Sequence, residues 1–160
     1  MSSNDPKPKR PPKPTDWRRR FRDARPPKRV VLDTDFAGIR AGSTLFIATP
    51  GLLANYAARV PSGEVREIRR LRNELARKHD ADATCPVTTA IFLRVVAEAA
   101  WDDLQDGQPL DRVVPFWRVI DPDSPIARKL RCGPDWIRAM REGEAGTAPL
   151  PEPPAPGGST

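Results

Sequence analysis

Apolar residues in the middle of the chain recur at regular spacings, and segments rich in glycine and proline separate the regular stretches. Residues 44–48 form a short apolar run that predicts a β-strand. Pro50 then suits the first turn of a helix whose apolar positions lie within residues 52–57. Residues 61–63, Pro-Ser-Gly, end that helix. The pattern therefore predicts a strand followed at once by a helix.

Two further helices are predicted next. Residues 64–79 place apolar side chains three and four positions apart, and Arg66, Arg70 and Arg77 share a different face. Residues 86–104 are apolar almost all round, so this helix must be largely buried. Two helices with a tight connection and a basic face on the first are consistent with a helix-turn-helix. A solvated surface would show the same arginine pattern, so both interpretations stay open.

The remaining part of the central region predicts β-structure and a short helix. Residues 113–120 are rich in β-forming residues, and Pro115 suits an edge strand or a bulge. Residues 121–125 turn the chain, and residues 134–141 predict a short amphipathic helix. We therefore predict one α+β, mostly helical domain over residues 42–144.

Both ends of the chain are rich in proline. We expect residues 1–41 to form a basic arm that is mostly disordered, and residues 145–160 to form a disordered Pro/Gly-rich tail, because such segments have little apolar surface to bury. Residues 1–30 hold 11 of the 27 Lys and Arg residues against three Asp. An arm of this kind suits a polyanion. A tail that only keeps the protein in solution would have the same composition.

The composition excludes several classes of protein. No apolar run approaches the ~20 residues of a membrane span, and the first residues lack the apolar core of a secretory signal. Cys85, Cys132 and His79 are too few to form a metal cage. We therefore expect a cytoplasmic protein that has no cofactor or metal and does not contact a membrane.

One segment carries a resemblance to a known family. Residues 115–120, Pro-Phe-Trp-Arg-Val-Ile, resemble the active-site pattern Pro-Cys-His-Arg-Val-Ile/Val of the alkylguanine-DNA alkyltransferases, with four of six positions in agreement. Gly63-Glu64-Val65, Gly133 and Glu142-Gly143 match further family positions in the same order. The resemblance covers about residues 44–144. It implies a winged helix-turn-helix like the C-terminal domain of those proteins, and DNA as the partner.

A group of small methyltransferase-like proteins is more similar still. These proteins combine a Thr-Cys-Pro helix start, an Ala-Glu-Ala stretch and a Pro-Tyr-Trp-Arg-Val segment. The matching residues here are Thr84-Cys85-Pro86, Ala97-Glu98-Ala99 and residues 115–119. The chain is thus identified as similar to alkyltransferase-like proteins that lack the acceptor cysteine.

The chain differs from the family pattern at the two positions on which alkyl transfer depends. Phe116 stands at the position of the acceptor cysteine and Trp117 at that of the histidine, and neither side chain is a nucleophile or a base. Alkyl transfer at this site is excluded. Alkyltransferase-like members with an aromatic residue in place of the cysteine still bind lesions, which implies a pocket for a flipped, modified base. Its expected lining is Pro115, Phe116, Trp117, Arg118 and Val119. The alternative is that the aromatic rings fill the cavity as core.

The resemblance also suggests which residues contact DNA. The candidates are Arg66, Arg70, Thr88, Thr89 and Arg94. The family's arginine near the start of the recognition helix is absent from residues 88–91, and its tyrosine on the first helix falls on Ile68. Thr88 and Thr89 either donate to phosphates or cap the helix. Arg118 matches an invariant family arginine, which implies a structural hydrogen-bonding role.

Three functions follow from these patterns. The first is a non-catalytic DNA-binding protein that recognises alkylated or modified bases. The second is a winged-helix DNA-binding protein without lesion specificity, with an architectural or regulatory role. The third is an enzyme that uses Cys85, since a helix N-terminus lowers a thiol pKa, although a small buried cysteine is the common alternative.

Overall fold

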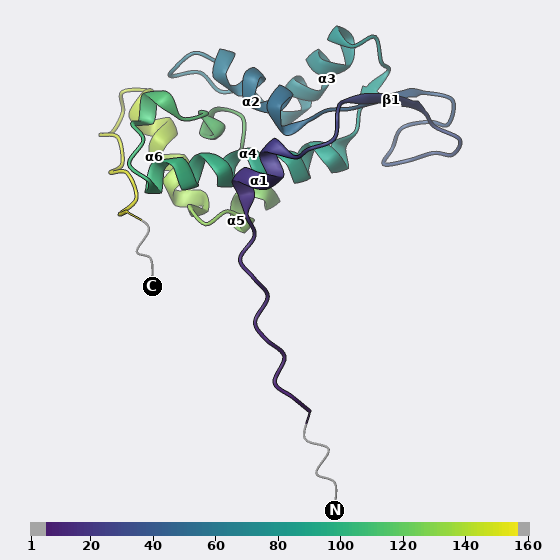
Figure 1. The fold of residues 1–160 in the computed structure, drawn as a ribbon. Helices are drawn as coiled ribbons and strands as arrows, with labels where there is room; N and C mark the ends of the chain where they lie inside the picture. Colours follow the sequence, from purple (N-terminus) through teal and green to yellow (C-terminus); the bar gives the residue numbers. More distant parts are fainter. Residues whose placement is uncertain (1–5, 157–160) are drawn as a thin grey trace, which may run out of the picture.

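The computed structural model describes residues 6–156 and shows an α+β fold that is mostly helical, as the sequence predicts (Figure 1). In chain order the elements are α1 (Trp17–Arg22), β1 (Lys28–Val31), β2 (Thr44–Ile47), α2 (Pro50–Arg59), α3 (Ile68–Lys78), β3 (Ala83–Thr84), α4 (Pro86–Gln105), the 3₁₀ turns η1 (Leu110–Arg112) and η2 (Phe116–Arg118), α5 (Pro125–Lys129) and α6 (Gly133–Glu144). No helix of this described part is long and apolar enough to cross a membrane.

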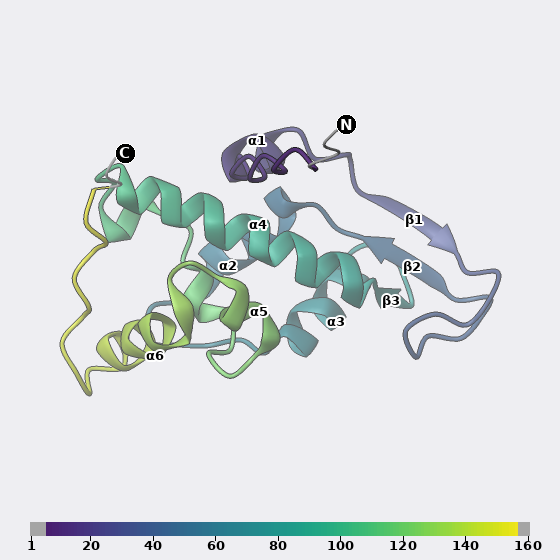
Figure 2. The same cartoon turned by 90° about the horizontal axis from the view of Figure 1, so that it is seen from below.

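The long helix α4 forms the centre of the molecule. Helices α1, α2 and α5 pack against it, and ten of its residues are buried. The two ribbon views place α1 and α3 on opposite sides of α4 (Figures 1 and 2). The main core lies between α4, α2, α3 and the C-terminal elements η2, α5 and α6, and a small separate cluster of Trp17, Val95 and Ala99 joins α1 to α4.

A three-stranded sheet covers one end of α4. β1 pairs antiparallel with β2, and β2 pairs parallel with the short β3 that leads into α4. The loop between β1 and β2 turns tightly at Ala37 and Gly38, whose φ angles are 50° and 81°. It extends away from the helices (Figure 2). The parallel β2–β3 pair fixes the start of α4 next to the sheet.

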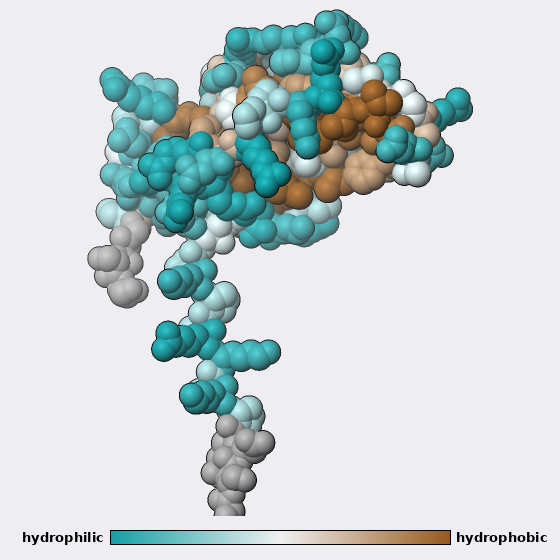
Figure 3. Space-filling view, turned by 45° about the vertical axis from the view of Figure 1, so that its right-hand side comes forward, coloured by the Kyte–Doolittle hydropathy of each residue, from teal (hydrophilic) through white to brown (hydrophobic). Residues whose placement is uncertain are grey.

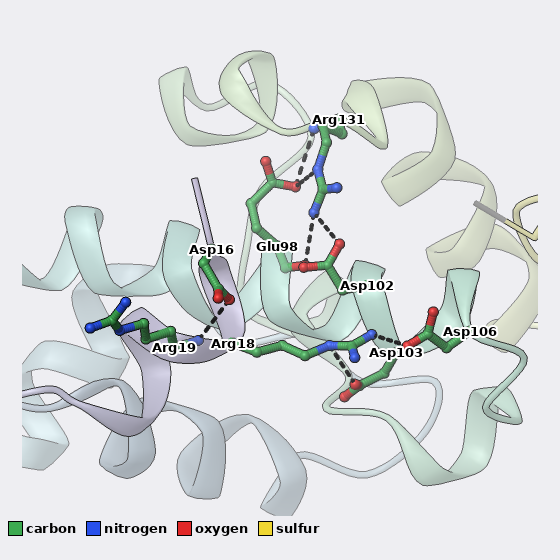
Figure 4. A network of polar contacts seen from close by, with 8 residues as sticks. All are labelled: Asp16, Arg18, Arg19, Glu98, Asp102, Asp103, Asp106 and Arg131. Atoms are coloured by element: carbon green, nitrogen blue, oxygen red, sulfur yellow. Dashed lines mark hydrogen bonds and ion pairs between the residues drawn. The ribbon is translucent and has the colours of Figure 1, made fainter. Parts of the chain in front are cut away.

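The prediction that residues 1–41 are mostly disordered is wrong for α1 and β1. Trp17 is buried against α4, between the guanidinium groups of Arg20 and Arg94 at 5.3 and 5.0 Å from its ring. Arg18 forms ion pairs with two aspartates at the far end of α4 (Figure 4). The two aspartates lie 85 and 88 residues away from Arg18 in the chain, so no local pattern reveals them. Residues 1–5 lie outside the described part.

The rest of the two predicted tails has no regular structure. Residues 6–16 form no helix or strand and are almost entirely exposed, and residues 145–156 form no helix or strand either. Residues 157–160 lie outside the described part. The basic residues before α1 are therefore attached to the domain through α1.

The strand predicted over residues 113–120 is absent. Pro115 has no N–H, and its φ and ψ of −80° and 68° form a tight turn in which the Phe116 amide donates to the Val114 carbonyl at 2.8 Å. Residues 116–118 then form the 3₁₀ turn η2. Because the consecutive residues 115–117 and 119–120 are buried, the apolar run reflects burial rather than the alternation of a strand. The helix predicted from residue 64 also begins later, at Ile68.

Candidate nucleic-acid interface

Helix α3 presents a basic outer face. Leu71, Leu75 and Ala76 are buried and fix one side of the helix against the core, so the opposite side faces solvent. That exposed side carries Arg69, Arg70, Arg77 and Lys78. Figure 3 shows hydrophilic residues over the top of the molecule, where α2 and α3 lie. The sequence pattern predicts Arg70 and Arg77 on this face, and Arg69 and Lys78 add to it. Arg66, which the pattern also assigns to the helix, lies just before α3 and is partly buried.

A shared carboxylate fixes the position of Arg70. Its Nε donates to Glu74 Oε1 at 2.8 Å, and the Tyr56 hydroxyl on α2 donates to the other oxygen of Glu74 at 2.6 Å. These hydrogen bonds lower the pKa of Glu74, the one from Tyr56 most strongly. Burial, followed by the bond to Glu74, raises the pKa of Tyr56 to about 12. The tyrosine therefore stays a neutral donor and the glutamate stays charged across the physiological range.

A groove between α2 and α3 collects further positive charge. It encloses about 300 Å³. Four cationic side chains line it against the single carboxylate of Glu74, and they are Arg59, Arg66, Arg70 and Lys78. Arg59 comes from α2, so sequence periodicity within α3 could not have found it. The groove and the adjoining outer face form one surface, which we call the α3 basic surface: Arg59, Arg66, Arg69, Arg70, Arg77 and Lys78.

Several positive charges of the α3 basic surface are not paired with any carboxylate of the described chain and are available to a ligand. Arg66 lies 3.7 Å from Glu64 and Arg70 pairs with Glu74, whereas Arg59, Arg69, Arg77 and Lys78 form no ion pair with any residue that the structure describes. Guanidinium groups match the oxygen atoms of a phosphate with paired hydrogen bonds. The surface is therefore suited to an anion with several phosphate groups.

The other three predicted DNA contacts do not join this surface. Thr89 is fully buried, and its hydroxyl donates to the Cys85 carbonyl at 2.6 Å, so the prediction that it contacts DNA is wrong. Thr88 is partly buried and lines a groove beside α1. Arg94 stacks on Trp17, on the α1 side of α4. A helical pattern cannot reveal that α1 covers this part of α4.

The predicted base pocket is filled by its own side chains. Phe116 and Trp117 are 0% and 2% exposed, and Pro115 is buried as well. The Phe116 ring packs against Trp117 and Trp136 with centroid separations of 5.4 and 5.8 Å. Pro115, Phe116 and Trp117 therefore form part of the core, as the alternative interpretation predicts, and they do not line an open pocket.

Val119 does line a cavity, on the side that faces α3. The cavity encloses about 260 Å³ at the start of α3, and Ile68 and Ile126 form apolar parts of its wall. Arg66 and Arg69 lie at the same cavity, so it adjoins the α3 basic surface. Of the five predicted pocket residues, Val119 is the one that lines this space.

Arg118 has a structural role. Its Nη1 donates to the Val60 carbonyl at 2.8 Å, and its Nη2 donates to Glu144 Oε1 at 2.7 Å. Burial raises the pKa of Glu144, but hydrogen bonds from Arg118 and from the Gly63 amide bring it below the ordinary value of 4.5. The ion pair thus joins α6 to the end of α2 and holds the η2 turn in place.

The two cysteines are poorly placed for nucleophilic chemistry. Cys85 is 3% exposed at the start of α4, and its carbonyl accepts the Thr89 hydroxyl. Burial raises the pKa of Cys132 to about 12. Among residues 6–156, no group of three or more His, Cys, Asp or Glu side chains is arranged to hold a metal ion.

Comparison of the chain with protein-family models, with curated proteins and with solved structures finds no match.

Proposed function

We propose that this protein binds duplex DNA without catalysis, through the α3 basic surface. The observation that carries the proposal is the set of four cations there, Arg59, Arg69, Arg77 and Lys78, that form no ion pair with any described residue. Each phosphate contact releases condensed counterions, which supplies affinity for any duplex sequence. The burial of Phe116 and Trp117 favours a binding mode that does not require a damaged base.

We propose that α3 and α4 correspond to the two helices of a helix-turn-helix and that the β1–β2 hairpin corresponds to its wing. Residues 79–85, which include β3, join the two helices. Because α4 is buried over most of its length, the basic contact surface is on α3 and its neighbour α2. We propose that the relation to alkyltransferase-like proteins is one of fold and partner, with the acceptor chemistry lost.

The proposal predicts that removing two charges from α3 weakens DNA binding. Arg69 and Arg77 are exposed and unpaired, so R69A/R77A leaves the core intact. We expect about tenfold weaker binding of a labelled 20-base-pair duplex in fluorescence anisotropy at fixed salt, because two phosphate contacts are lost.

A matched control removes the same charge elsewhere. Arg128 and Lys129 are exposed on α5, and the structure describes no ion pair for either. R128A/K129A should therefore bind the duplex like the wild type. If both double variants weakened DNA binding equally, the loss would follow from the reduced net charge of the protein alone. That result would contradict a specific role for the α3 basic surface.

A second candidate function, recognition of a modified base, is favoured by the cavity beside Val119. At about 260 Å³ this cavity is slightly smaller than a typical small-ligand site. A base flipped out of the duplex could enter it while Arg66 and Arg69 contact the flanking phosphates. Unstacking costs least for a damaged base, so the cavity would favour modified over normal DNA.

Base recognition predicts a difference between matched duplexes. The protein should bind a duplex with one alkylated guanine about tenfold more tightly than the unmodified duplex, without transfer of a labelled alkyl group. Ile126→Phe narrows the cavity from a partly exposed position and should remove this preference while unmodified DNA binds as before. Equal affinity of the wild type for both duplexes would exclude the second candidate and leave the first intact.

A further inference from the structure

A second groove lies on the other side of α4, between α1, β1 and α4. It encloses about 800 Å³, within the range of known ligand sites. Its floor is apolar and consists of Ile47, Ala48, Phe92 and Val95. In Figure 3 hydrophobic residues reach the surface on the side where β1, β2 and the start of α4 lie. This apolar surface is available to a partner and is separate from the α3 basic surface.

The rim of this groove is positively charged. Arg19, Arg20, Arg25 and Lys28 line it, together with the single carboxylate of Asp23. Asp23 lies 3.4 Å from Arg19. Arg25 and Lys28 form no ion pair within the described residues. A partner that fits the groove therefore combines apolar groups with negative charge.

β1 begins at the groove, where Lys28 is part of the lining, and its outer edge continues from there with no paired strand in the described part of the chain. β1 pairs with β2 alone in the three-stranded sheet, and the Leu32 amide donates to the Ser43 carbonyl at 3.0 Å. Hydrogen-bonded and non-hydrogen-bonded pairs alternate along an antiparallel ladder. The backbone groups of Arg29 and Val31 therefore point away from β2. Val31 is also 65% exposed. The edge thus offers two donors and two acceptors to an extended chain.

We infer that this groove binds an extended acidic peptide segment of a partner protein, which adds to the sheet along β1. Alternate side chains of such a peptide would enter the apolar groove, and its carboxylates would meet Arg25 and Lys28. The open edge distinguishes a peptide from an acyl chain, since only a peptide has backbone groups to pair with it. The apolar floor also favours a peptide over a nucleic acid, because the phosphates of a nucleic acid would reach the cationic rim but leave the floor without apolar partners.

The test uses a labelled ten-residue probe in which glutamate alternates with valine and phenylalanine. Fluorescence anisotropy measures its binding to the full chain, and a probe with lysine in place of glutamate tests the role of charge. Val31→Pro removes an N–H that points to solvent, so the β1–β2 ladder remains intact. R25E/K28E reverses the charge of the rim, and R128E/K129E on α5 is its matched control.

We expect Val31→Pro and R25E/K28E each to weaken binding of the acidic probe about tenfold or more, and the lysine probe not to bind. R128E/K129E and the DNA-binding variant R69A/R77A should bind the probe like the wild type. The inference is therefore independent of the proposed function. If Val31→Pro binds the probe as the wild type does, the peptide does not pair with β1. If R25E/K28E binds it as the wild type does, the positive charge of the rim does not contribute to binding. Either result would contradict the inference.

Amide hydrogen exchange of the wild type gives a second readout that needs no variant. The bound probe should protect the Arg29 and Val31 amides, which point to solvent in the free protein, and should leave exchange on α3 unchanged. Protection on α3 alone, or displacement of the probe by duplex DNA with no change at β1, would contradict the inference.

Discussion

At the scale of single residues, Phe116 and Trp117 show that a sequence motif alone does not distinguish aromatic side chains that line a pocket from aromatic side chains that fill the core. The sequence places them at the acceptor cysteine and histidine of a family pattern, and it left open whether they line a pocket or fill it. The structure packs them against Trp136 on α6. Phe116 and Trp136 are 20 residues apart in the sequence, and α5 lies between them in the chain. The motif at residues 115–120 therefore gives no sign of this contact. A cysteine at position 116 would be buried and would have no histidine beside it.

Arg118 carries the clearest energetic prediction at this scale. Its ion pair with Glu144 has side chains that are 16% and 9% exposed. Arg118→Ala leaves the Glu144 carboxylate without its cationic partner, although the Gly63 amide still donates to it, and leaves the Val60 carbonyl without the Arg118 donor. We expect the free energy of unfolding at pH 7 to fall by about 3 kcal/mol, measured by urea denaturation.

The same pair gives a pH dependence with a definite sign. The folded-state pKa of Glu144 lies below its ordinary value of 4.5, so its stabilising contribution is complete above that pH and is lost as the pH falls through the folded-state pKa. Glu144→Gln should therefore be less stable than the wild type at pH 7, and the difference should shrink toward pH 3. A difference that stays constant with pH would contradict the assignment.

At the scale of elements, α1 shows the limit of reading the chain by composition. Its sequence, WRRRFR, looks like part of a solvated basic arm, yet Asp16 caps the helix and Trp17 packs against Val95 and Ala99. Arg18 reaches Asp103 and Asp106 at the other end of α4 (Figure 4). The contacts that hold α1 in place therefore involve residues of both α1 and α4, which are far apart in the sequence, and the composition of α1 alone does not reveal them.

Two truncations separate the anchored helix from the residues before it. Removal of residues 1–15 should leave the free energy of unfolding within about 0.5 kcal/mol of the wild type, since residues 6–15 are all exposed. Removal of residues 1–26 also deletes Trp17 and Arg18 and should lower it by about 3 kcal/mol or more. Equal stability of the two truncated proteins in urea denaturation would show that α1 contributes nothing to the fold.

Helices with strong periodicity could be predicted, and irregular segments could not. The sequence placed α2, α4 and α6 within a few residues of their observed bounds, because burial of one face or of the whole helix leaves a repeating pattern. It failed over residues 113–120, where a proline turn buries consecutive side chains. It identified half of the α3 basic surface but missed Arg59, which a different helix supplies.

At the scale of the whole molecule, α4 separates two surfaces of different character. The α2–α3 side is basic and hydrophilic, whereas the α1–β1 side combines an apolar groove with a basic rim. We propose that the first contacts DNA and the second a peptide, so one domain could bind both at once. Residues 6–16 add Lys7, Lys9, Arg10 and Lys13, which are all exposed.

The most direct test of the central claim is the salt dependence of duplex binding. For the wild type and for R69A/R77A, the logarithm of the association constant is plotted against the logarithm of the salt concentration. Each phosphate contact contributes about 0.9 to the slope, so the double variant should have a slope shallower by about 2, while R128A/K129A keeps the wild-type slope. An unchanged slope in R69A/R77A would show that α3 does not contact the phosphates and would contradict the proposed function.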